Sequence, residues 1–183
     1  MNRPSPLAIL AFVATAACGS QAGGTGTPVT LLDYQARVPA TFVSRPPTSS
    51  MRLAEFSVPR TDGTSAEVLV FYFGEGEGGS VEANIARWNS QFTGPDGVPV
   101  TPRVGALDGA EFPTTIAEFA GTYARGMGAG PGAAGALPDQ GLVAAVVETA
   151  RGSLFFQLVG DGVAVTDARE DFLDFVGSVA SGS

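Results

Sequence analysis

The sequence predicts an α+β fold in which two helices pack against a mainly antiparallel sheet. Two turns between apolar runs, one at Asp62 and Gly63 and one near residues 150–152, indicate that strands adjacent in sequence pair as hairpins. Two amphipathic segments, which begin near Ser80 and after Thr166, indicate helices with one buried face. Strands outnumber helices and neighbours pair, which favours the α+β class over a parallel α/β arrangement.

Strand-forming runs fill the first part of the expected domain. Residues 31–43 offer one short strand, or two strands separated at Pro39. Residues 51–60 mix apolar and polar side chains, and residues 65–73 form a continuous β-branched and aromatic run. The turn between the last two runs predicts that they form an antiparallel hairpin.

The first helix is expected directly after a glycine-rich loop at residues 74–79. Ser80 is a typical N-cap, and Glu82 in the first turn suits the positive end of the helix dipole. The apolar residues that follow are spaced so that they share one helical face. These residues are Val81, Ile85, Trp88 and Phe92.

The second half of the chain continues the alternation of strands and turns. Strand signals are weak in residues 99–107 and better in 114–124, and the Gly/Ala/Pro-rich segment 126–140 is expected to be a surface loop. Residues 141–160 indicate a hairpin of two apolar strands. The last helix is expected to begin after Thr166, with its acids near the helix start explained by the dipole. Its buried side is expected to carry Phe172, Phe175, Val176 and Val179.

Composition excludes several classes of function. The 183 residues suit one domain with short appendages, expected over residues 31–183. The net charge is -8 and all the basic residues are arginines, which makes nucleic acid a poor partner. Without histidine and with one cysteine, the chain has no Ser-His or Cys-His nucleophile system and no ordinary zinc site. No cofactor is expected.

The N-terminus predicts export. Residues 1–17 carry one cation, Arg3, and then an apolar run over residues 7–17. A helix of that length rises about 16 Å, too short for a hydrocarbon core of about 30 Å but typical of an export signal. We therefore interpret residues 1–17 as a signal peptide, and the glycine-, serine- and threonine-rich residues 18–30 as a flexible tether.

Cys18, the only cysteine, follows Thr15, Ala16 and Ala17 and precedes Gly19. This arrangement resembles the lipobox of bacterial lipoproteins, although that family usually has an aliphatic residue in place of Thr15. The resemblance implies acylation of Cys18, a membrane anchor and, in bacteria with two membranes, transport to the outer membrane. The alternative is ordinary signal cleavage after Ala16, which would leave Cys18 near the new N-terminus as a free thiol. The expected location is the cell envelope, at the outer membrane or in the periplasm.

Several runs together suggest a family. They are EVLVFYFG at 67–74, GGSVEANIARWNSQF at 78–92, GTY at 121–123 and GSLFFQLVGDGVAVTDAREDFLDFVGSV at 152–179. They resemble bacterial envelope proteins whose domain is a PsbP-like α-β-α sandwich. The matching positions are packing and turn residues, so the resemblance implies an assembly or interaction role without catalytic activity, and it implies no active-site residues.

The loop GEGEGG at residues 74–79 has the G-x-G-x-x-G spacing of a dinucleotide-binding turn. Glu75 and Glu77 would place two carboxylates inside the anion site, and the strand before the loop is expected in a hairpin rather than a parallel βαβ unit. Nucleotide binding is therefore not expected. The two glutamates, with Asn84 and Arg87 on the flank of the following helix, remain a possible interaction surface.

The predicted function is that of an exported, lipid-anchored, non-enzymatic envelope protein that binds a protein or another envelope component. The alternative is a carboxylate-dependent hydrolase of the cell envelope, because paired carboxylates have no sequence signature. Its candidate residues lie in or near the expected strands. They are Glu55, Glu67, Glu111 and Glu118.

Overall fold

The computed structural model describes residues 26–124 and 135–182. The predicted signal peptide, Cys18, the first part of the predicted tether and residues 126–134 of the expected loop lie outside the described residues.

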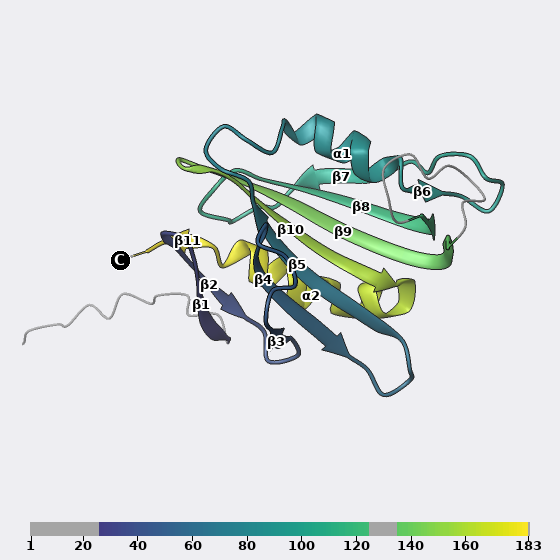
Figure 1. The fold of residues 1–183 in the computed structure, drawn as a ribbon, viewed down its shortest axis with the longest axis horizontal. Helices are drawn as coiled ribbons and strands as arrows, with labels where there is room; N and C mark the ends of the chain where they lie inside the picture. Colours follow the sequence, from purple (N-terminus) through teal and green to yellow (C-terminus); the bar gives the residue numbers. More distant parts are fainter. Residues whose placement is uncertain (1–25, 125–134, 183) are drawn as a thin grey trace, which may run out of the picture.

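The main sheet has eight strands, and every neighbouring pair in it is antiparallel (Figure 1). This confirms the predicted fold class. In spatial order the strands are β3 (Val43–Arg45), β4 (Arg52–Pro59), β5 (Ser65–Tyr72), β10 (Gly152–Asp161), β9 (Leu137–Thr149), β8 (Thr114–Tyr123) and β6 (Phe92–Thr93), and β7 (Arg103–Ala106) also pairs with β8.

Both predicted hairpins are present. The strands β4 and β5 pair from Pro59 opposite Ser65, on either side of the turn at Gly63. The strands β9 and β10 pair from Thr149 opposite Gly152. The strand β9 begins at Leu137, so the last residues of the loop expected at 126–140 are strand instead.

The helix α1 (Val81–Asn89) covers one face of the main sheet (Figure 1). Its predicted cap is confirmed, because the Ser80 side chain accepts a hydrogen bond from the backbone N–H of Ala83. The predicted helical position of Phe92 is wrong: the helix ends at Asn89, and Phe92 begins β6. Phe92 is still buried, in the same cluster as Trp88, although it lies on β6, which pairs with β8 in the main sheet.

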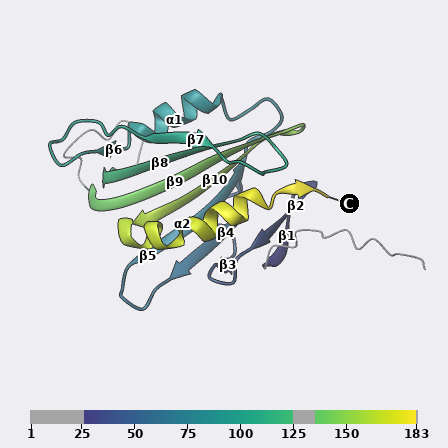
Figure 2. The ribbon, with the colours of Figure 1, turned by 180° about the vertical axis from the view of Figure 1, so that it is seen from behind.

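The helix α2 (Gly162–Gly177) lies on the opposite face of the sheet (Figure 2). It begins five residues earlier than predicted, directly after β10, because Ala164 and Val165 pack into the core rather than extending the strand. Gly141 provides the space, since a Cβ atom there would lie 3.0 Å from Val165. Tertiary packing overrides the β propensity of this Val-rich start.

A second, three-stranded sheet packs beside the C-terminal half of α2 (Figure 2). It consists of β1 (Thr27–Leu31), β2 (Tyr34–Val38) and β11 (Ala180–Ser181). The predicted tether is therefore too long at its end, because residues 27–30 belong to β1 and pair with β2. The burial of Leu31 and the partial burial of Val29 explain why this short run is held in place.

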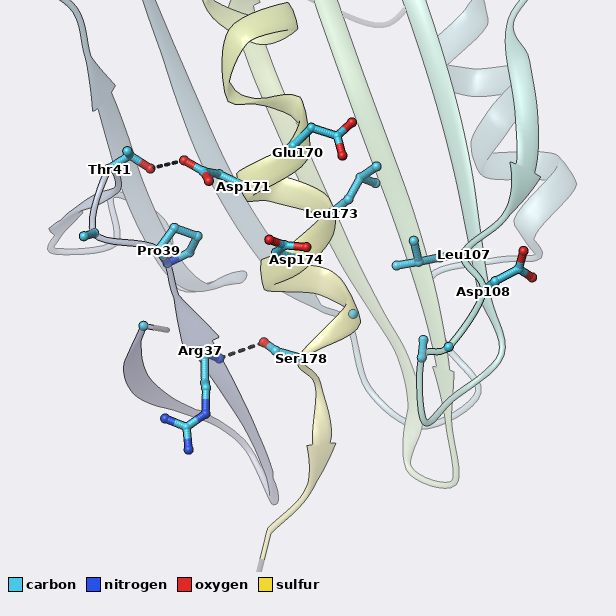
Figure 3. Close-up of a pocket in the computed structure, with 15 residues that line it drawn as sticks. Arg37, Pro39, Thr41, Leu107, Asp108, Glu170, Asp171, Leu173, Asp174 and Ser178 are labelled. Atoms are coloured by element: carbon cyan, nitrogen blue, oxygen red, sulfur yellow. Dashed lines mark hydrogen bonds between the residues drawn. The ribbon is translucent and has the colours of Figure 1, made fainter. Parts of the chain in front are cut away.

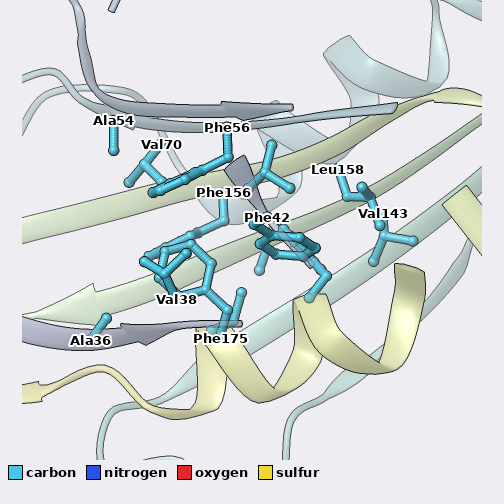
Figure 4. Packing of buried hydrophobic residues seen from close by; sticks show 14 of the residues in the cluster. Ala36, Val38, Phe42, Ala54, Phe56, Val70, Val143, Phe156, Leu158 and Phe175 are labelled. Carbon is cyan, nitrogen blue, oxygen red and sulfur yellow. The ribbon is translucent and has the colours of Figure 1, made fainter. Parts of the chain in front are cut away.

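Phenylalanine rings join the layers on the α2 side of the sheet (Figure 4). The ring of Phe175, on α2, makes edge contacts with Phe56 at 5.6 Å and with Phe156 at 5.4 Å between centroids. Phe42, in the segment after β2, contacts the same ring at 6.3 Å. Among the described residues, no helix has the length and apolar character needed to span a membrane.

Candidate functional site

The glycine-rich loop is a turn shaped by steric requirements. Gly76 and Gly78 have φ values of 73° and 91°, in the left-handed region that favours glycine. A Cβ atom on Gly78 would lie 2.7 Å from the ring of Phe155. The strand β5, which precedes the loop, is antiparallel to both of its neighbours, so the parallel βαβ unit of a dinucleotide site does not occur at this loop.

One member of the predicted interaction surface does not belong to it. Asn84 is only 2% exposed, and its amide donates to the carbonyl oxygens of Gly78 (2.8 Å) and Ser80 (2.9 Å). Its side-chain oxygen accepts a hydrogen bond from Arg87 at 2.6 Å. Asn84 thus ties the loop to α1 and is not accessible to a partner. Glu75, Glu77 and Arg87 are exposed, as the surface prediction requires.

Glu55 is buried as part of a local hydrogen-bond network. Its carboxylate accepts hydrogen bonds from the Thr48 backbone N–H at 2.9 Å and the Thr48 hydroxyl at 2.8 Å, and it forms an ion pair with Arg52. The Thr48 backbone hydrogen bond and the Arg52 guanidinium lower the pKa of Glu55 to about 2. Glu55 is therefore ionised at neutral pH and holds no proton for acid catalysis.

The other three candidate carboxylates also have structural partners. Glu118 lies between Arg103 and Arg169; burial raises its pKa, but hydrogen bonds from both arginines outweigh burial and lower it. Glu67 pairs with Arg45 at 3.4 Å. Glu111 accepts hydrogen bonds from the backbone and the hydroxyl of Ser181. These contacts give no support to a hydrolase built on these four residues.

The lowered pKa of Glu55 leads to a pH-dependent stability. Because its folded-state pKa of about 2 lies below the ordinary 4.5, ionised Glu55 stabilises the fold fully above about pH 4.5. This contribution is lost as the pH falls towards about 2. We expect Glu55→Gln to be less stable than the wild type at pH 7, and the difference to shrink at about pH 3.

Urea unfolding at both pH values measures this difference. Glu77→Gln, at an exposed position outside the Glu55 network, is the control and should change little at either pH. A Glu55→Gln deficit of the same size at both pH values would contradict the assignment of the stabilising role to the ionised carboxylate.

A groove runs beside α2, on the side of the helix that faces away from the main sheet (Figure 3). One wall is the segment at residues 39–41 after β2, and the other is the segment at 107–110 between β7 and β8. We call this feature the α2 groove. Its volume is about 780 Å³, against about 380 Å³ for a hollow beside Arg103 and Arg169.

The floor and rim of the α2 groove differ in chemistry. Leu173 on α2 and Leu107 at the base of the 107–110 wall form an apolar floor, partly buried against the core. Four acidic side chains line the groove, and in Figure 3 the guanidinium of Arg37 points away from the helix. The four acids are Asp108, Glu170, Asp171 and Asp174.

Two of these acids have a hydrogen-bond or ion-pair partner, and two do not. Asp171 accepts a hydrogen bond from the Thr41 hydroxyl at 2.6 Å, and Glu170 pairs with Arg169 at 2.5 Å. Within residues 26–124 and 135–182, no side-chain hydrogen bond or ion pair involves Asp108 or Asp174, and both are exposed. The α2 groove therefore has two free carboxylates, and Leu173 and Leu107 lie between them in Figure 3.

Sequence reasoning missed the α2 groove for a definite reason. With the helix expected after Thr166, the acids among residues 167–174 are predicted to lie near the helix start, where the helix dipole explains them. Because α2 begins at Gly162, its first turn contains no acid, and Glu170 and Asp174 lie in its later turns. The dipole explanation is therefore wrong for these residues. No sequence signal predicts that Asp108 lies near Glu170 and Asp174. It lines the same groove only because the connection between β7 and β8 passes beside α2.

Comparisons with known proteins identify the fold. The structure is similar to the solution structure of cyanobacterial PsbP (CyanoP) from Synechocystis sp. PCC 6803, with a TM-score of 0.52. The alignment covers 91% of this chain and 98% of that one, at 9% sequence identity. The fold is PsbP-like. The predicted sandwich is thereby confirmed, whereas identity this low shows the fold alone. No protein-family model and no curated protein matches the sequence.

Proposed function

We propose that this chain is an exported, lipid-anchored protein of the cell envelope that acts by binding a protein or another envelope component and catalyses no reaction. The observation that carries the proposal is the α2 groove, which has free charged groups and an apolar floor suited to a partner. The PsbP-like fold and the structural roles of the candidate catalytic carboxylates support it.

The position of the groove agrees with an anchor at Cys18. Gly26, the first described residue, lines the α2 groove. An extended chain spans at most about 3.6 Å per residue, so Gly26 lies within about 30 Å of an acylated Cys18. A lipid on Cys18 would therefore hold the groove close to the membrane surface, where an envelope partner is present at high effective concentration.

Replacing Cys18 tests the anchor. We expect the wild-type chain to incorporate a palmitate analogue during growth and to fractionate with membranes, and Cys18→Ser to do neither. Mass spectrometry of the mature chain should find Cys18 as the first residue. Thr15→Leu, which restores the usual lipobox residue, is the matched control and should be labelled at least as well as the wild type.

Two outcomes would contradict the anchor. Equal incorporation into the wild type and Cys18→Ser would exclude acylation at this thiol. A mature chain that begins at Ala17, with no label, would show ordinary signal cleavage after Ala16 and a chain released into the periplasm.

A further inference from the structure

We propose that the α2 groove binds an extended basic segment of a protein, with an apolar side chain placed between its arginine or lysine residues. This inference rests on the binding function proposed above and specifies the chemistry of the partner. The inference is based on the positions of the charged and apolar side chains that line the groove and on the volume of the groove.

The charges of the groove favour a cationic ligand. Asp174 projects from α2, and Asp108 lies on the β7–β8 connection with its carboxylate directed away from the helix (Figure 3). Both carboxylates lack a partner among the described residues and are exposed, so a cation reaching either of them displaces no existing ion pair. The cation of the groove, Arg37, directs its guanidinium away from them. The chain as a whole carries a net charge of -8, which adds attraction over a longer range.

The acids of the groove are too dispersed for a metal ion. Within the described residues, no three acidic side chains come close enough together to hold one. A ligand that neutralises Asp108 and Asp174 together must therefore carry cations at separate points, as a peptide with several basic side chains does.

The floor adds a requirement that a small cation does not meet. Leu107 and Leu173 lie at the base of the groove and are only partly buried by the core. An apolar side chain of the ligand that covers them removes apolar surface from water, and this burial favours binding. A basic segment that carries an apolar side chain between its cations satisfies the rim and the floor together.

Peptide binding to the purified full-length protein tests the inference. The probe is a fluorescent Arg-Arg-Leu-Arg-Arg peptide, measured by anisotropy at low ionic strength. Asp108→Asn/Asp174→Asn keeps the shape of both exposed side chains, and we expect it to weaken binding about tenfold. The matched control is Glu75→Gln/Glu77→Gln, which removes the same charge at the glycine-rich loop and should change the affinity less than about twofold.

Variants of the peptide separate the two contributions. A citrulline version, which has no charge, should lose detectable binding, and an Arg-Arg-Ser-Arg-Arg version should bind several-fold more weakly. Melting temperatures of both double variants within about 2 °C of the wild type show that folding is intact.

Four results would overturn the inference. They are no binding of the arginine peptide by the wild type at millimolar concentration, equal losses in the two double variants, undiminished binding of the citrulline or serine peptide, and displacement of the peptide by spermidine at equal concentration. In any of these cases, an envelope partner that still cross-links to the wild-type chain leaves the proposed binding function standing. The absence of any cross-linked partner contradicts the proposed function itself.

Discussion

Replacing Phe175 by alanine should lower the free energy of unfolding by about 3–5 kcal/mol. The side chain is fully buried and its ring makes edge contacts with Phe42, Phe56 and Phe156, so the truncation removes contacts with three segments and leaves a cavity. Because this ring holds α2 against the sheet and against the segment after β2, the same change should loosen the α2 groove.

Urea denaturation of the wild type and Phe175→Ala measures this loss. Phe73→Ala is the matched control, since Phe73 is 37% exposed although it contacts Phe155 at 5.4 Å. The control should cost less than about 2 kcal/mol. Equal losses for the two variants would show that the ring cluster on the α2 side is not the centre of the core.

Replacing Gly78 by alanine should cost about 2–4 kcal/mol, because it combines two unfavourable effects. The backbone at Gly78 has a φ of 91°, and the new Cβ atom would lie 2.7 Å from the ring of Phe155. Gly76→Ala is the matched control: its φ is 73°, but no atom lies within 4 Å of the added carbon. The control should cost about 1 kcal/mol, for the left-handed backbone alone.

Thermal and urea unfolding of both variants check this expectation. Equal costs at Gly78 and Gly76 would show that contact with Phe155 does not fix the loop. A rise in the melting temperature of the wild type with millimolar NAD or ATP, lost in Gly78→Ala, would show instead that the loop holds a phosphate group.

The sequence was sufficient to predict the fold class because its strongest signals are local. The turn at Gly63 and the turn near Gly152 specify hairpins between neighbouring strands, and Ser80 specifies the start of α1 by a cap that needs no distant contact. Hairpin pairing in turn excludes the parallel unit that a dinucleotide loop requires. These conclusions depend on residues only a few positions apart.

The errors come from features that depend on distant contacts. The early start of α2 depends on space beside Gly141, and β1 is held by pairing with β2 and by burial of Leu31 in the shared core. Asn84 is predicted to lie on the surface because the sequence gives no sign that its side-chain amide will be buried against backbone carbonyls. The α2 groove brings together three segments that are far apart in the chain, so no local pattern could reveal it.

The most direct test of the proposed function is cross-linking in living cells from a photoreactive residue placed at Ala110, which lines the α2 groove, compared with the same residue at Glu77. We expect a discrete adduct from position 110 only, which disappears when the Arg-Arg-Leu-Arg-Arg peptide competes and weakens in Asp174→Asn. An adduct from position 77 alone, or one from position 110 that neither treatment reduces, would contradict binding in the α2 groove.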